Sequence, residues 1–212
     1  DWSSDVCSSD LTRPDLSSSL SQLQSQINSA KVSTLIDANK TLHIAKKHHE
    51  VTIKIKSINP QDLRFLAFSD ASFASKAKPE SHAGMIIMAT HKDITNNQTC
   101  QVSPLSWGSK KIQRVVTSTL SAETSALSTT LDQLTWMRLY WAWFFDQSLK
   151  WQDPSKVNDL PQAITVPTIK CDEKDLAITD CKSLYDLTTR TAVPNCSEFR
   201  TQLQARAIKD IL

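Results

Sequence analysis

The segment LAFSD, Leu66–Asp70, is nearly repeated far downstream as LAITD, Leu176–Asp180. Each segment is a short apolar run that ends in an aspartate, as expected for a buried strand with a polar residue at its carboxyl end. If the two strands are parallel neighbours about 4.8 Å apart, Asp70 and Asp180 can approach one cation. The two segments therefore predict two walls of one site, at the sheet edge where α/β proteins bind ligands.

A third carboxylate, Glu123, begins the apolar row of the longest expected helix, Leu120–Phe145. The row continues through Leu127, Leu131, Leu134, Met137, Trp141 and Phe145. An unpaired buried charge costs several kcal/mol, so a carboxylate in this row is expected to have a partner or to bind a metal. The alternative is an exposed first turn in which Glu123 only stabilises the helix N-terminus. With the two aspartates, Glu123 would complete an all-oxygen site suited to Mg²⁺ or Mn²⁺.

The rest of the chain alternates between helical and extended patterns. Leu16–His49 has helical spacing, and Val51–Ile58 alternates strictly, as a half-buried strand does. Other strands are expected at Arg64–Phe73, Ala83–Thr90, Cys100–Trp107 and Leu176–Thr179, a loop at Lys150–Val166, and further helices at Lys182–Thr189 and Ser197–Leu212. This order predicts a mixed α/β sheet flanked by helices and preceded by a small helical segment.

Composition narrows the class of protein. The 212 residues are 40% hydrophobic, which suits one domain plus an extra segment. The net charge is only +2, but Lys31–Lys56 is basic and Asp146–Asp186 is acidic, which permits a polyanionic partner without requiring one. With only two glycines, Gly84 and Gly108, the chain has no glycine-rich phosphate loop, which excludes the Walker and dinucleotide fingerprints.

Cysteine usage and hydropathy give expectations about location. The five cysteines contain no C-x-x-C pair and are expected to be reduced thiols in an intracellular protein. The longest apolar stretch, Leu139–Phe145, is too short to span a bilayer, so no membrane association is expected.

Five motifs occur in an order that resembles one family. They are FSDASFA (Phe68–Ala74), SHAGM (Ser81–Met85), SWGSKKIQ (Ser106–Gln113), SAETSALS (Ser121–Ser128) and ITDCKSL (Ile178–Leu184). Together they resemble the ribonuclease H domain of copia-type retrotransposon Pol polyproteins. Upstream, TRPDL at Thr12–Leu16 is similar to a run near the end of the reverse transcriptase of that family.

The resemblance implies a ribonuclease H-like, mixed five-stranded sheet and endonucleolytic hydrolysis of RNA in RNA–DNA hybrids. Asp70, Glu123 and Asp180 match three catalytic acids that would hold two Mg²⁺ or Mn²⁺ ions, and such an ion pair activates water and stabilises the leaving oxygen. The implied partners are the hybrid and the rest of the Pol polyprotein, including its reverse transcriptase. The implied location is a cytoplasmic virus-like particle or the nucleus.

Substrate contacts are expected just before the long helix. Ser106, Lys110, Lys111 and Arg114 lie in or beside the SWGSKKIQ motif, where they could hold phosphates of the hybrid. A solvated basic loop is the alternative.

One position departs from the family pattern. Gln202 stands where the family has a fourth acidic residue, and Arg206 stands near where it has a histidine. Asp210 or Glu198 would substitute only if the alignment shifts. A non-catalytic module that binds or positions the hybrid for a polymerase is therefore the alternative function. An integrase-type core fits less well, because its glutamate usually comes last.

Three segments are expected along the chain. Residues 1–11, DWSSDVCSSDL, contain SSD twice and resemble translated sequencing adapter, so we leave them out of the fold. Residues 12–60 are expected to be the C-terminal remnant of a reverse transcriptase, helical with one strand. Residues 61–212 are expected to be the ribonuclease H-like domain, truncated at its C-terminus.

Overall fold

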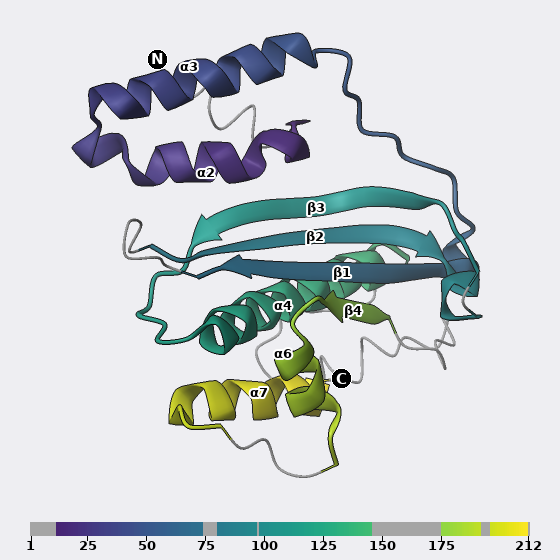
Figure 1. Cartoon of the computed structure of the whole chain (residues 1–212). Coiled ribbons are helices and arrows are strands. Elements are labelled where there is room, and N and C mark those ends of the chain that lie inside the picture. The colour runs from purple at the N-terminus through teal and green to yellow at the C-terminus, as the bar shows by residue number, and fades with distance from the viewer. Residues whose placement is uncertain (1–11, 74–79, 97, 146–174, 192–195, 212) are drawn as a thin grey trace.

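The computed structural model describes residues 12–73, 80–96, 98–145, 175–191 and 196–211 (Figure 1). The expected loop at Lys150–Val166 and the first eleven residues lie outside these ranges. The described residues form a mixed α/β structure in which a sheet is flanked by helices.

Four strands form the sheet, in the order β3-β2-β1-β4. They are β1 (Leu63–Ser72), β2 (His82–His91), β3 (Val102–Lys111) and β4 (Leu176–Thr179). β2 is antiparallel to both β1 and β3, whereas β4 runs parallel to β1. The sequence predicts five strands, and the described residues contain four.

The prediction of a strand at Val51–Ile58 is wrong, because this segment connects α3 to the turn before β1 and has no strand pairing. The Lys56 N–H donates to Ser103 Oγ at 2.8 Å. This bond joins the segment to β3 through a side chain and not through paired backbone groups. Of the alternating apolar residues, Ile55 is 64% exposed, whereas Ile58 at the end of the segment packs against the core.

The described α-helices come both before the first strand and after the third strand in the sequence. They are α2 (Ser17–Ser25), α3 (Val32–Lys47), α4 (Thr119–Phe145), α6 (Lys182–Thr189) and α7 (Phe199–Ile211). Short 3₁₀ turns occur at Pro14–Leu16, Ile27–Ser29, Pro60–Asp62 and Lys92–Asn96. Proline begins two of these turns, since its fixed φ suits a first helical position.

The core lies between α4 and the central strands. Leu127, Leu131 and Leu134 of α4 are buried in one cluster with Phe65 and Ile87 of β1 and β2. Leu184 of α6 and Ile208 of α7 complete this cluster from below the sheet (Figure 1). The amphipathic row expected in the long helix is therefore confirmed as far as Trp141, while the side chain of Phe145 lies outside the described atoms.

α4 runs antiparallel to β1. Near its start, Glu123 lies beside Asp70, and near its other end the ring of Trp141 meets Phe65 edge-on, with ring centroids 6.1 Å apart. This direction sets which residues of the helix reach which end of the strand.

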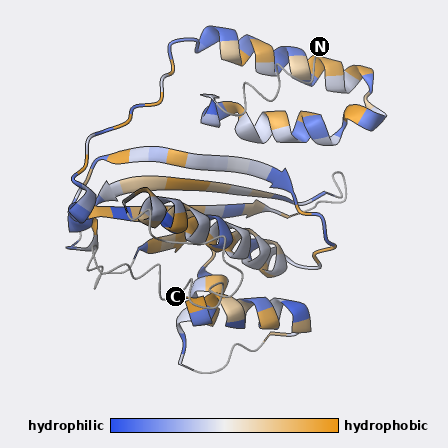
Figure 2. Cartoon of the chain, turned by 180° about the vertical axis from the view of Figure 1, so that it is seen from behind, coloured by the Kyte–Doolittle hydropathy of each residue, from blue (hydrophilic) through white to orange (hydrophobic). Residues whose placement is uncertain are grey.

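A separate helical layer lies above β3 (Figure 1). α2 contacts β3 and buries Leu20, whereas α3 contacts α2 and buries only Thr41 of its own residues. Hydrophobic residues occur along both helices of this layer in Figure 2, and several of their side chains are exposed. The largest are Ile27, Val32, Leu35, Ile36, Leu42 and Ile44.

The structure also describes the state of three cysteines and the hydropathy of the helices. The cysteines among the described residues for which a state is assigned, Cys100, Cys181 and Cys196, are free thiols. Within the described ranges, no helix combines the length and the hydropathy that a transmembrane span requires.

Candidate metal centre

Asp70, Glu123 and Asp180 converge at one end of the sheet. Each offers one carboxylate oxygen, and the three oxygens lie within 4.8 Å of one another. Asp70 belongs to β1, Asp180 directly follows β4, and Glu123 lies in the first turns of α4. Among the described residues, this is the one group of three or more histidine, cysteine or acidic side chains close enough to share a metal ion.

The register of the parallel strands explains the meeting of the aspartates. Leu66 pairs with Leu176, and the ladder continues to Ser69 and Thr179. Asp70 and Asp180 are therefore the next residues along the two strands, one strand spacing of about 4.8 Å apart. The near-repeat of LAFSD and LAITD marks two adjacent strands of one site.

Glu123 is the buried member of the group. Its side chain is 5% exposed, and Oε2 has no hydrogen-bond partner among the described residues. The Ala71 N–H donates to the carboxylate, but burial, followed by repulsion from Asp70 and Asp180, raises the pKa of Glu123 to about 7. Asp70 and Asp180 are exposed, so the site is open on their side.

The donor set fits a hard divalent cation. All three ligands are carboxylates, which suit Mg²⁺ or Mn²⁺ and not a thiolate-loving metal. A cation at this position would offset the repulsion among the acids and give the buried Glu123 Oε2 a partner.

The start of α4 is fixed by hydroxyl groups and by Glu198. Ser118 Oγ accepts the Ser121 N–H at 3.1 Å, which caps the helix, and Ser121 Oγ donates to Glu198 at 3.3 Å. Thr117 Oγ1 donates to the other Glu198 oxygen at 2.8 Å, and this bond is the main reason that the pKa of Glu198 is lowered. These contacts tie the turn that carries Glu123 to the segment just before α7.

The structure brings no fourth acid to the group. Gln202 is half-buried on α7, and its N–H bonds to the Glu198 carbonyl. Within the described ranges, neither Glu198 nor Asp210 joins the three carboxylates. Arg206 is exposed on the same helix.

Two of the four expected substrate-binding residues, Lys111 and Arg114, have side-chain partners within the protein. Lys111 Nζ pairs with Glu80 at 2.6 Å, Arg114 bonds to Gln204, and Ser106 is half-buried in β3. Lys110 is exposed. It lies on β3, two strands from β1 and thus roughly 10 Å from it.

Asp175 contacts both β1 and α4, and sequence reasoning missed it. It directly precedes β4, accepts the Phe65 N–H at 2.8 Å through Oδ1 and pairs with Arg138 Nε at 2.5 Å through Oδ2. Its position just before an apolar strand was visible in the sequence, but its two partners depend on the tertiary fold.

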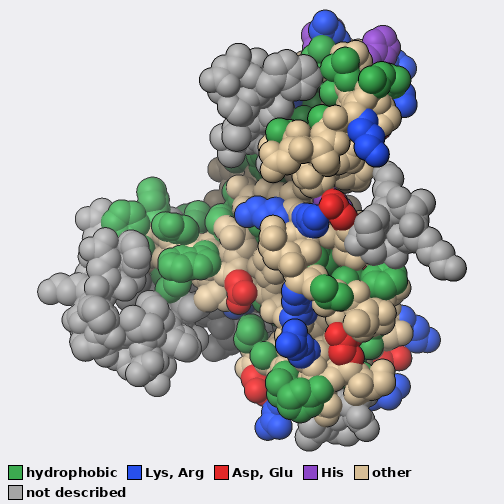
Figure 3. Space-filling model, turned by 90° about the vertical axis from the view of Figure 1, so that its left-hand side faces the viewer, with side chains coloured by type: hydrophobic (Ala, Val, Ile, Leu, Met, Phe, Trp, Pro, Cys, Tyr) green, Lys and Arg blue, Asp and Glu red, His purple; other side chains and the backbone are tan. Residues whose placement is uncertain are grey.

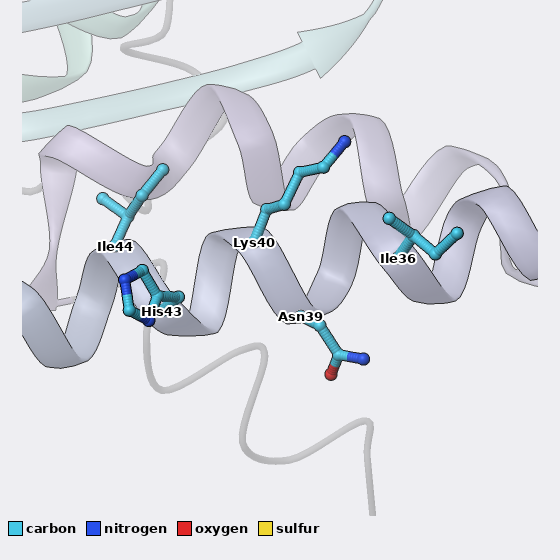
Figure 4. Close-up of a pocket in the computed structure, with 5 residues that line it drawn as sticks. All are labelled: Ile36, Asn39, Lys40, His43 and Ile44. Atoms are coloured by element: carbon cyan, nitrogen blue, oxygen red, sulfur yellow. The ribbon is translucent and has the colours of Figure 1, made fainter.

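A shallow pocket lies away from the acids, on the outer side of α3 (Figure 4). Ile36, Asn39, Lys40, His43 and Ile44 line it. None of these five residues carries a carboxylate or a thiol, and His43 is exposed.

Comparisons with known proteins leave the family open. No protein-family model and no curated protein matches the chain. One similar solved structure is the crystal structure of prototype foamy virus protease-reverse transcriptase (native), with 12% sequence identity and a TM-score of 0.25. The match covers 76% of this chain and 22% of that one, so the chain spans less than a quarter of the viral protein's length. This similarity is too low to establish a shared fold.

Proposed function

We propose that the chain is a ribonuclease H-type endonuclease that uses divalent metal ions to hydrolyse the RNA strand of RNA–DNA hybrids. The observation that carries the proposal is the meeting of Asp70, Glu123 and Asp180 from three elements remote in the sequence. The five motifs that resemble the copia-type ribonuclease H domain supply the reaction and the substrate. The role of each acid as a catalytic ligand belongs to this proposal.

The three carboxylates would hold the metal from different sides of the site. Asp70 and Asp180 are exposed and would hold metal where a phosphodiester can approach, while the buried Glu123 would hold it from the helix side. Bound Mg²⁺ or Mn²⁺ would supply Lewis-acid activation of water and charge stabilisation at the leaving oxygen. Lys110 would contact a phosphate of the hybrid at a distance from the reacting bond.

The surface charge is consistent with modest affinity for the hybrid. Lys and Arg side chains are spread over the face in Figure 3 among acidic and uncharged ones and do not form one continuous patch. In the longer polyprotein that the resemblance implies, a reverse transcriptase would deliver the hybrid, in a virus-like particle or in the nucleus.

The test is cleavage of an end-labelled RNA–DNA hybrid in Mg²⁺ or Mn²⁺. The wild-type chain should cut the RNA strand only, EDTA should stop the reaction, and Asp70→Asn should slow it by at least about 100-fold because a metal ligand is weakened. Asp186→Asn, at an exposed ion pair on α6, is the matched control and should cleave like the wild type. Equal cleavage by Asp70→Asn, or cleavage in EDTA, would contradict the proposal.

Gln202 supports a second candidate, a non-catalytic module that binds or positions the hybrid. A neutral residue in the fourth position removes one charged ligand, and no other acid among the described residues replaces it. In that case the wild-type chain binds the hybrid in Mg²⁺ but leaves its RNA strand intact.

A further inference from the structure

Two contacts at opposite ends of α4 link the same three elements. At one end Glu123 meets Asp70 and Asp180, and at the other end Arg138 meets Asp175. The stretch of α4 between Glu123 and Arg138 is roughly 22 Å long. The stretch of β1 between Phe65 and Asp70, beside the two contacts, is roughly 17 Å long. α4 is therefore held to β1 and β4 at two separate places, near the three acids and near the ion pair of Asp175 with Arg138.

β4 has little else to define its position. It is four residues long, and among the described strands it pairs with β1 alone. Short edge strands are weakly fixed in register, and a slip by one residue turns every side chain to the opposite face. Such a slip would carry Asp180 away from Asp70 and Glu123.

Asp175 holds the start of this strand against both neighbours. Phe65 and Asp175 directly precede the first ladder pair, Leu66 with Leu176, and the Phe65 N–H bonds to the Asp175 side chain instead of to a backbone carbonyl. The other carboxylate oxygen pairs with Arg138 of α4. Asp175 is 12% exposed and Arg138 is 29% exposed, so solvent screens this pair only in part.

We infer that Asp175, held by Arg138, is the positioning residue of the metal centre, because it sets the register of β4 on β1 and thereby delivers Asp180 to the other two acids. The inference rests on the proposed metal centre. Asp175 itself binds no metal in this scheme, since it lies at the far end of β4 from the three carboxylates.

The test measures metal binding and strand docking separately in the full 212-residue chain. Mn²⁺ affinity is read from the electron paramagnetic resonance of the free ion, and docking of β4 is read from amide hydrogen exchange at Leu176 and Ile178, whose N–H groups face β1. Asp175→Ala should weaken Mn²⁺ binding at least about tenfold. The same variant should speed exchange of the β4 amides at least about tenfold relative to those of β2.

Two controls separate positioning from general stability. Asp186→Asn removes an exposed carboxylate beside Arg190 on α6 and should change neither Mn²⁺ affinity nor β4 exchange. Ile87→Val loosens the core at β2 and is the control for Mn²⁺ affinity alone, which it should leave unchanged. Arg138→Gln in the Asp175→Asn background should recover part of the lost Mn²⁺ affinity, because it removes the cation left unpaired by the first substitution. If Asp175→Ala does not fold, Arg138→Gln takes its place, since it removes the cation that holds the Asp175 carboxylate and should change Mn²⁺ affinity and β4 exchange in the same direction.

The outcomes distinguish this inference from the proposed function. Unchanged Mn²⁺ affinity in Asp175→Ala, with a wild type that binds, overturns the positioning role, and so does unchanged exchange of the β4 amides. A wild type that binds no Mn²⁺ overturns the metal centre. In that case faster β4 exchange in Asp175→Ala still supports the role of Asp175 in placing Asp180, and unchanged exchange refutes it.

Discussion

When no metal is bound, the buried carboxylate of Glu123 lowers the stability of the folded protein. A carboxylate that is nearly buried and faces Asp70 and Asp180 is destabilised in its charged form, which is why its pKa rises to about 7. Natural chains retain such a residue when a ligand offsets the cost. Measurements of the unfolding free energy should therefore report on the charge and metal occupancy of this site.

The first prediction concerns Glu123→Gln and pH. Because the pKa of Glu123 is about 7 in the folded protein and ordinarily 4.5, the folded state keeps a proton that the unfolded chain releases, and this group lowers stability as pH rises from 4.5 to 7. The variant should match the wild type near pH 4.5 and exceed its unfolding free energy by up to about 3 kcal/mol at pH 8. Urea unfolding in EDTA at several pH values measures the difference.

Metal addition provides the control for this prediction. Mg²⁺ should raise the unfolding free energy of the wild type at pH 8, since it binds the folded state alone, and should raise that of Glu123→Gln much less. A variant that is less stable than the wild type at pH 8 without metal would show that Glu123 is not an unpaired buried charge.

The second prediction concerns Gln202→Glu. If the fourth position of this copy is damaged, as the resemblance implies, restoring an acid should raise Mn²⁺ affinity or hybrid cleavage by about tenfold. Gln24→Glu, at an exposed site on α2, adds the same charge elsewhere and should change neither quantity. An equal response to both substitutions would point to an effect of net charge alone.

At the scale of elements, the sequence predicts best where one local pattern decides the outcome. The strand at Leu176–Thr179 and the helix at Lys182–Thr189 have the expected bounds. β3 begins later and ends later than expected, because its pairing with β2 continues to Lys111. The segment Val51–Ile58 alternates like a strand but has no strand partner, and alternation alone cannot show that.

The site divides in the same way. The three acids could be found from the sequence because each one interrupts or ends an apolar pattern, and parallel pairing then brings two of them together. The partners of Lys111, Arg114 and Asp175 could not be found, since each lies on an element remote in the sequence. The division into residues 12–60 and 61–212 stays a prediction.

The third prediction tests the apolar row of α4. Leu127 lies one turn after Glu123 and is fully packed in the core, so Leu127→Ala should lower the unfolding free energy by about 2–5 kcal/mol through the cavity it leaves. Leu203 on α7 is 52% exposed, and Leu203→Ala should cost less than about 1 kcal/mol. Urea titration of both variants makes the comparison, and similar losses would mean that α4 is not the element that closes the core.

At the scale of the whole molecule, the helical layer and the sheet differ in how much they bury. α4 is packed against β1 and β2 and also contacts α7, whereas α3 contacts α2 and leaves most of its apolar side chains exposed. Local opening is easiest where few side chains are buried. Stability should therefore fall from the sheet outward.

The fourth prediction follows from this difference. Amides in α3 should exchange with solvent at least about 100-fold faster than amides in the middle of α4. Hydrogen exchange followed by mass spectrometry at several protein concentrations measures both helices at once. Protection of α3 that grows with concentration would instead show that a second copy covers its apolar face.

The direction of α4 limits how the chain can change in length. An extra residue anywhere between positions 123 and 138 would rotate one end of the helix by about 100° relative to the other and move it about 1.5 Å along the axis. Either Glu123 would then turn from the two aspartates, or Arg138 would turn from Asp175. Insertions and deletions in this stretch should thus be far less acceptable than substitutions, and relatives that keep the chemistry should keep this spacing.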